Sequence, residues 1–234
     1  MKRPGWLPRA SLREVGPIAA FGVIALSLIG FLALADIFGD EPPKALEESI
    51  LIALRVPGDP STPIGPLWLQ YAIADITALG GFTVLTLLTV GAAIYRIVLK
   101  DYATALIILV AVGSGAIASN ILKLLFDRAR PELVEHLTHA TSSSFPSGHA
   151  TQAAIAFLTL GALMARAQPD RRLKTLILAG AVLLTILVGC SRVYLGVHWP
   201  TDVLAGWCFG AAWAAIWWLV LRRVVRTTSQ GALP

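Results

Sequence analysis

Six long stretches of the 234-residue chain contain no Asp, Glu, Lys or Arg, and they limit the possible folds more than any other feature. A helix of about 20 apolar residues crosses the roughly 30 Å hydrocarbon core of a bilayer. Four stretches have 19 to 21 residues, and the other two have 16 and 17 but are flanked by Arg, Lys or His side chains that can reach the interface. The predicted spans are Val15–Ala35, Ile76–Tyr95, Tyr102–Leu122, Ala150–Ala165, Thr175–Ser191 and Val203–Leu221.

The composition agrees with a membrane protein. Only 14% of the residues are charged, whereas a soluble domain has about a quarter. We therefore predict an all-α fold, a six-transmembrane helical bundle that forms a single domain over residues 1–234. The first apolar stretch is longer than the core of a cleavable signal peptide, which favours a retained membrane anchor.

The distribution of basic residues predicts the orientation. With the N-terminus in the cytoplasm, the inner segments hold 13 of the 19 Lys and Arg residues, and 11 of the 14 acidic residues lie outside. Short cytoplasmic loops are enriched in Lys and Arg. We expect a multi-pass protein of the plasma (inner) membrane with both termini cytoplasmic. The net charge of +5 reflects this topology, and no nucleic-acid partner is expected.

The longest predicted outer segment, residues 36–75, begins with prolines followed by an amphipathic pattern. This pattern predicts a helix that lies on the membrane surface. The Pro/Gly-rich stretch Pro57–Pro66 predicts a turn-rich connector. The segment is either a cover over the bundle end, which we favour, or part of a lipid entrance.

Three polar groups fall at the predicted outer ends of the spans and contain Lys123 to Arg130-Pro131, Pro146-Ser147-Gly148-His149, and Ser191-Arg192 to His198 and Asp202. Guanidinium groups bind phosphate oxygens in a bidentate manner, and Lys adds a point charge. The cations Lys123, Arg130 and Arg192 therefore suit a phosphate ligand.

The second group predicts an anion site at a helix N-terminus. Pro146 can occupy an early helical position, so that Ser147, Gly148 and His149 offer backbone N–H groups, and Gly148 allows a close approach.

The two histidines have separate predicted tasks. Asp202 follows His198 by four residues and can hold one ring nitrogen, which leaves the other nitrogen free to attack. His149 stands at the head of another helix, where it can act as general acid toward a leaving oxygen. These parts fit phosphoryl transfer through a phosphohistidine.

The pattern Lys-x6-Arg-Pro, Pro-Ser-Gly-His and Ser-Arg-x5-His-x3-Asp, with its core over residues 123–202, resembles the type 2 phosphatidic acid phosphatase (PAP2) superfamily. The resemblance implies a bacterial-type integral membrane lipid phosphatase with its active site at the outer membrane face, toward the periplasm or the extracellular side. His198 would be the nucleophile, Asp202 its partner and His149 the acid. The implied phosphate-binding residues are Lys123, Arg130, Ser147, Gly148 and Arg192.

The resemblance also implies a metal-independent enzyme without a cofactor. Its substrate would be a membrane lipid with a phosphomonoester or diphosphate headgroup, such as undecaprenyl diphosphate, phosphatidylglycerol phosphate, phosphatidate or a lipid A phosphate. The pattern predicts neither the particular lipid nor the oligomeric state.

Four other functions compete with this one. A lipid-to-acceptor phosphotransferase would use the same residues. A metal site built from the two histidines and the carboxylate is disfavoured, because the surrounding cations repel a metal ion. A haloperoxidase is disfavoured because such relatives are soluble. A non-catalytic lipid-phosphate transporter or receptor is disfavoured because the predicted spans carry almost no charge.

Several other residues are assigned structural roles. His136 and His139 are expected to be solvated, and Asp127 and Arg128 to form a local surface pair. Gly206 and Gly210 are expected to let helices pack closely within one chain. Cys190 and Cys208 lack metal or redox spacing and are expected to be small buried residues.

Overall fold

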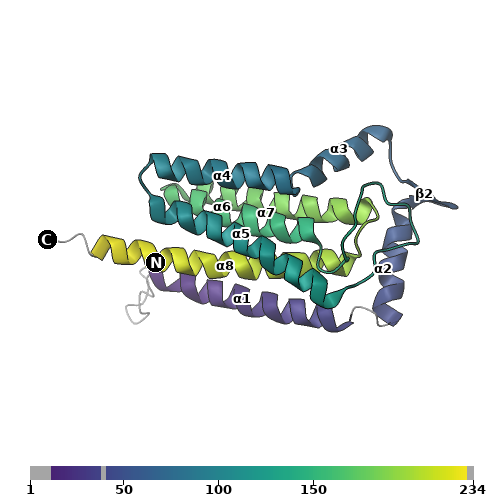
Figure 1. Cartoon of the computed structure of the whole chain (residues 1–234), viewed down its shortest axis with the longest axis horizontal. Helices are drawn as coiled ribbons and strands as arrows, with labels where there is room; N and C mark the ends of the chain where they lie inside the picture. Colours follow the sequence, from purple (N-terminus) through teal and green to yellow (C-terminus); the bar gives the residue numbers. More distant parts are fainter. Residues whose placement is uncertain (1–11, 38–40, 231–234) are drawn as a thin grey trace, which may run out of the picture.

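A computed structural model describes residues 12–37 and 41–230, in which eight helices and one short β-hairpin are found (Figure 1). The helices are α1 (Leu12–Ile37), α2 (Glu41–Ala53), α3 (Leu67–Ala78), α4 (Phe82–Val98), α5 (Tyr102–Phe126), α6 (Gly148–Ala167), α7 (Arg171–Tyr194) and α8 (Pro200–Gln230). The antiparallel strands are β1 (Arg55–Val56) and β2 (Asp59–Pro63), with Arg55 opposite Pro63. This hairpin occupies the first part of the predicted turn-rich connector.

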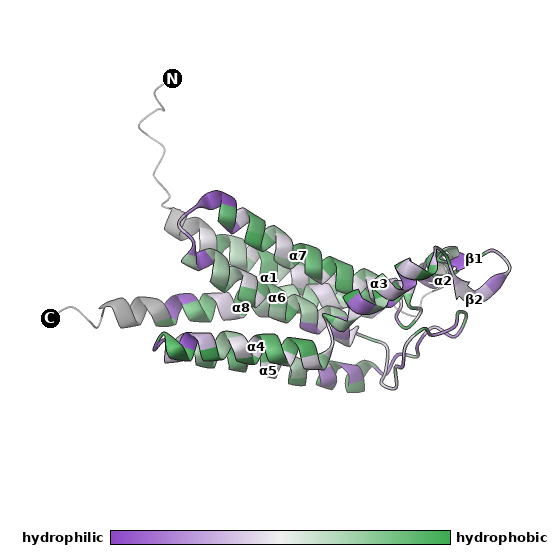
Figure 2. Cartoon of the chain, turned by 90° about the horizontal axis from the view of Figure 1, so that it is seen from above, coloured by the Kyte–Doolittle hydropathy of each residue, from purple (hydrophilic) through white to green (hydrophobic). Residues whose placement is uncertain are grey.

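Five described helices, α1, α5, α6, α7 and α8, are long and apolar enough to cross a membrane. Hydrophobic residues occupy most of the helix lengths, and polar residues gather toward the ends of the bundle (Figure 2). The start of α1 and the end of α8 lie at the same end, away from α2 and the hairpin (Figure 1).

The predicted span Ile76–Tyr95 is not one straight helix. It crosses a break between α3 and α4, which meet at a bend of 48° and can form a sixth span only as a bent pair. Gly80 and Gly81 lie at this break, and glycine is a poor residue for a helix interior. A Cβ atom on Gly80 would lie 3.2 Å from the backbone oxygen of His149, so glycine allows the chain to approach α6 here.

Helix α6 forms the centre of the bundle. It packs against α7 and α8, and 61% of the residues in its most apolar stretch are buried. A Cβ atom on Gly206 would lie 2.9 Å from Thr151 Oγ1, and one on Gly210 would lie 2.9 Å from the Thr151 carbonyl oxygen. The two glycines therefore allow close packing of α8 on α6, as predicted.

The loops beyond the ends of the spans are tied to one another by buried polar contacts. Arg55 is buried and donates to the backbone oxygens of Tyr194, at 3.0 Å, and Glu135, at 3.3 Å. The Tyr194 hydroxyl donates to the Ile64 backbone oxygen at 2.6 Å. These contacts fix the hairpin against the end of α7, so that this end of the bundle is covered.

Both cysteines are free thiols. Cys208 is partly buried, whereas Cys190 is exposed on the surface of the bundle. The expectation that both are buried is wrong for Cys190, which is exposed.

Candidate functional site

His198 lies in the turn between α7 and α8, and Asp202 lies in the first turn of α8. Pro200 starts α8, where its missing N–H costs no helical hydrogen bond. This start brings Asp202 Oδ2 to 3.4 Å from His198 Nδ1, as predicted. The opposite ring nitrogen, Nε2, lies 3.2 Å from Arg130 Nη1.

Two further donors hold Oδ2 of the Asp202 carboxylate. The Trp199 backbone N–H donates to Oδ2 at 2.9 Å, and the Ser144 hydroxyl donates to the same oxygen. Ser144 Oγ also lies 3.3 Å from His198 Nδ1. The imidazole is thus fixed on its Nδ1 side.

Burial keeps the His198 ring neutral. The residue is 2% exposed, and Asp202 is fully buried. Burial lowers the pKa of His198 to about 4, although hydrogen bonding and attraction to Asp202 act in the opposite direction. A neutral imidazole with one nitrogen held and the other facing cations can attack a phosphorus centre.

Three predicted cations lie close enough to one another to repel. Lys123, in the last turn of α5, donates to the Ser143 carbonyl at 2.6 Å. Arg130 donates to the carbonyls of Ser142, at 2.8 Å, and Val197, at 2.6 Å. Burial lowers the pKa of Arg130, and the nearby Asp202 carboxylate offsets part of this shift.

Arg192 is the most deeply buried of the three cations. Its Nη1 donates to Thr77 Oγ1 at 2.9 Å, and its buried Nε has no hydrogen-bond partner among the described residues. Because an unsatisfied buried donor is costly, a group of mutually repelling cations with a spare donor favours a bound anion.

The structure modifies the prediction for the start of α6. The helix begins at Gly148, with Ser147 as its N-cap, so Pro146 precedes the helix instead of lying within it. The Ser147 N–H is not available to a ligand, because it donates to the Asp202 backbone oxygen at 3.0 Å. Gly148 and His149 are the first two helical residues, whose N–H groups have no acceptor within the helix.

Ser147 still offers one polar group to the site. Its side chain is fully buried, and its hydroxyl has no hydrogen-bond partner among the described residues. The Cε atom of Lys123 lies 3.3 Å from the position of a Cβ atom on Gly148, so a larger residue there would crowd the lysine. The start of α6 and the end of α5 therefore share one small polar space.

His149 lies against the break between α3 and α4. Its Nε2 is 3.9 Å from the position of a Cβ atom on Gly81. The ring is close enough to His198, Arg192 and Lys123 to interact with their charges. His149, on α6, and His198, in the turn before α8, are thus brought near each other.

A groove of about 400 Å³ leads away from His149 between α4, α5 and α6. Its walls are mainly apolar and include Leu85 and Val112, with Thr86 and Asn120 among the polar residues. The groove runs along helices that can span a membrane, and one end is formed by Gly148 and His149. It can therefore take an apolar chain whose polar end reaches His149.

The prediction for Arg128 was wrong. Its side chain is 9% exposed and forms ion pairs with Asp202 Oδ1, at 2.6 Å, and with Glu47 Oε2, at 2.7 Å, instead of pairing with Asp127 at the surface. Glu47, in α2, and Ser144, in the serine-rich loop before α6, were also missed. The sequence signals for two of these residues were weak. Arg128 is a charged residue in the spacer between Lys123 and Arg130, and Glu47 is a carboxylate in a predicted amphipathic helix.

The remaining histidines lie outside this cluster. His139 is exposed, as predicted, and His136 is half-buried with its Nε2 2.6 Å from the Pro131 backbone oxygen. The site residues therefore include two of the four histidines.

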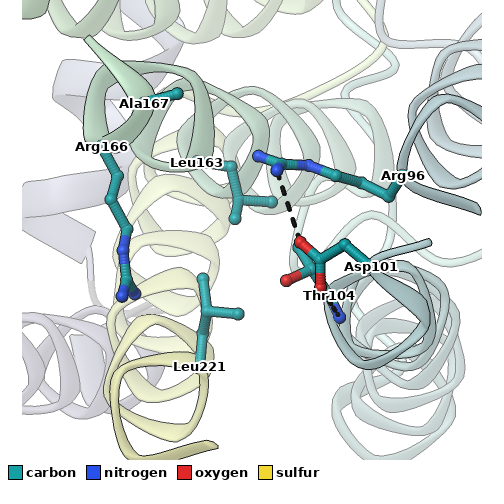
Figure 3. A pocket seen from close by; sticks show the side chains of 7 residues that line it. All are labelled: Arg96, Asp101, Thr104, Leu163, Arg166, Ala167 and Leu221. Carbon is teal, nitrogen blue, oxygen red and sulfur yellow. Dashed lines mark hydrogen bonds and ion pairs between the residues drawn. The ribbon is translucent and has the colours of Figure 1, made fainter. Parts of the chain in front are cut away.

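A second pocket, of about 240 Å³, lies by Arg166 and Ala167, at the other end of α6 from His149. Figure 3 shows the side chains that line it. Arg96 and Asp101 form an ion pair at 3.4 Å on one side, and Arg166 lies across the pocket from them. It shares no residue with the groove beside His149.

Several helices are long and apolar enough to cross a membrane, so the fold is that of a multi-pass membrane protein. The family model "PAP2 superfamily" matches residues 104–226, more than half of the chain, so the chain belongs to this family. The matched region contains all the predicted site residues.

Two curated relatives are phosphatases by name. Phosphatidylglycerophosphatase B of Bacillus subtilis is 35% identical over 150 residues, which cover 61% of this chain and 70% of that protein. Lipid A 1-phosphatase of Rhizobium johnstonii is 32% identical over 123 residues, which cover 49% of this chain and 44% of that protein. The chain thus spans less than half the length of the second relative.

A solved structure extends the likeness to most of the fold. The crystal structure of a transmembrane PAP2 type phosphatidylglycerolphosphate phosphatase from Bacillus subtilis has a TM-score of 0.73 and 28% sequence identity to this chain. The match covers 89% of this chain and 96% of that one.

Proposed function

We propose that this chain is an integral membrane lipid phosphatase that works through a phosphohistidine at His198. The observation that carries the proposal is the His198 ring: it is buried, held at Nδ1 by Asp202, and directed at Nε2 toward Arg130. Membership of the PAP2 superfamily and the names of its relatives support the reaction class.

In the first step, His198 Nε2 forms a bond to phosphorus while the bond between phosphorus and the leaving oxygen breaks. His149 gives its proton to that oxygen, and the alcohol or phosphate product leaves. Asp202 stabilises the positive charge that develops on the His198 ring. Lys123, Arg130 and Arg192, together with the Ser147 hydroxyl and the Gly148 N–H, bind the phosphoryl oxygens.

In the second step, a water molecule displaces His198 from the phosphorus atom. His149, now neutral, takes a proton from the water as its oxygen bonds to phosphorus. The bond from phosphorus to Nε2 breaks, inorganic phosphate leaves, and His198 returns to its neutral form. No residue changes its charge over the full cycle, and the step calls for no metal ion, so we expect turnover to persist in excess chelator.

The substrate is proposed to be a lipid whose tail occupies the groove between α4, α5 and α6. Apolar walls that end at His149 suit a lipid with a terminal phosphate or diphosphate. Undecaprenyl diphosphate, phosphatidylglycerol phosphate, phosphatidate and lipid A phosphates fit this description. Phosphatidylglycerol phosphate is the first to test, given the name of the B. subtilis relative.

The test is release of phosphate from this panel of lipids by the purified chain. We expect at least one lipid to be hydrolysed and His198→Ala to abolish turnover, with a loss of roughly 10⁴-fold or more because the nucleophile is removed. His139→Ala is the matched control, since this histidine is exposed and belongs to none of the three motifs. Full turnover by the folded His198→Ala variant would refute the proposed nucleophile, and no hydrolysis of any lipid would refute the phosphatase assignment.

A further inference from the structure

We propose that Glu47 and Arg128 are positioning residues for the nucleophile and act on it through Asp202. The inference rests on the proposed function, because it concerns the residues that hold His198. Neither residue is a fixed position of the three motifs: Arg128 lies in the spacer between Lys123 and Arg130, and Glu47 comes from α2, between the first two predicted spans.

The first support is a buried row of charges. Arg128 lies between two carboxylates, with Nη1 2.6 Å from Asp202 Oδ1 and Nη2 2.7 Å from Glu47 Oε2. All three side chains are 9% exposed or less. The Arg128 guanidinium also lies 5.4 Å from the centre of the Trp199 ring. Buried charges at these distances are costly unless each is paired, which fixes the geometry of the row.

The second support is the contact between Glu47 and the start of α8. Glu47 Oε1 accepts hydrogen bonds from the Thr201 backbone N–H, at 3.0 Å, and from the Thr201 hydroxyl. Free N–H groups in a first helical turn require such an acceptor. Glu47 therefore caps α8 from another helix and fixes the turn that carries Asp202.

The third support is that the two carboxylate oxygens of Asp202 have different partners. Arg128 occupies Oδ1, while Oδ2 receives the Trp199 N–H and the Ser144 hydroxyl and faces His198. Because Arg128 also pairs with Glu47, the negative charge of Glu47 offsets part of the attraction between Arg128 and Asp202. Without the Glu47 charge, the attraction between Arg128 and the Asp202 carboxylate would be stronger. Asp202 would then stabilise a positively charged His198 ring less well.

The test compares Glu47→Gln with the wild-type chain on the same lipid. Glutamine keeps an oxygen that can accept from Thr201 but removes the charge. We expect kcat and the rate of phosphohistidine formation in a rapid-quench experiment to fall roughly tenfold, as for loss of one charge-assisted contact, while KM stays unchanged. Glu48→Gln, the neighbouring carboxylate in α2, is the matched control and should keep the wild-type rates.

A second variant separates positioning from folding. Glu47→Asp keeps the charge on a shorter side chain, and we expect its kcat to lie above that of Glu47→Gln, whatever their thermal unfolding midpoints in detergent. The inference is overturned if Glu47→Gln forms phosphohistidine at the wild-type rate. It is also overturned if the fall in kcat of the two variants is in proportion to the fall in their thermal unfolding midpoints. Failure of the wild-type chain to form phosphohistidine would instead refute the proposed function.

Discussion

At His198, burial lowers the pKa and the Asp202 carboxylate raises it, and burial has the larger effect. The folded-state pKa is about 4, below the value of about 6.5 for a free side chain. Between these values the unfolded chain binds more protons than the folded chain, so this residue makes folding less favourable as the pH falls from about 6.5 to 4.

We therefore expect the His198 ring to stay neutral at pH 5.5. The measurement is a titration of ¹⁵N-histidine-labelled protein in detergent, with the His198 signals assigned by their loss in His198→Gln. Free histidine in the same sample is the internal reference and should be mainly protonated at this pH. A His198 ring that titrates together with the reference would contradict the buried geometry.

The residues of the site differ in how well the sequence predicted them. Lys123, His149 and His198 stand in short motifs with fixed spacing, which made them recognisable. Glu47 and Arg128 are 81 residues apart in the sequence, and no local sequence pattern predicts that they form an ion pair. The same holds for Ser144, which reaches Asp202 across 58 residues.

At the scale of the helices, the apolar stretches predicted the positions of the spans, but not the shape of the second. Residues 76–95 contain no charged residue, yet Gly80 and Gly81 separate α3 from α4 within that range. The apolar pattern continues through the break, because membrane helices on either side need the same composition. What distinguishes the break is the close packing of Gly80 against Val188 of α7 and His149 of α6, a tertiary contact.

Helix packing also gives a matched pair of substitutions. Gly210→Ala would place a methyl group against Ala154 and the Thr151 carbonyl, whereas a methyl group on Gly91 would have nothing within 4 Å. We expect Gly210→Ala to destabilise the fold by about 1–3 kcal/mol, and Gly91→Ala to leave it unchanged or slightly more stable. Thermal unfolding midpoints in detergent would measure both. Equal midpoints for the two variants would argue against close contact of α6 with α8.

At the scale of the whole molecule, the predicted orientation rests on the distribution of Lys and Arg, and it can be tested by labelling. In a chain carrying Cys190→Ser and Cys208→Ser, we expect an impermeant maleimide to label Thr141→Cys on intact cells. Gln168→Cys, in the connection between α6 and α7, should react only after the cells are broken. The reverse pattern would place the histidines on the cytoplasmic side.

The central position of α6 has a consequence for how the chain is made. Among the five single-helix spans, α6 has the lowest mean hydropathy, 1.3, compared with 2.2 for α7. It therefore gains less than its neighbours from contact with lipid during insertion. Only Gln168–Asp170 separates α6 from α7, so the two helices are suited to leave the translocation channel as one hairpin. We therefore expect α6, the helix that carries the proposed general acid, to insert into the membrane together with α7.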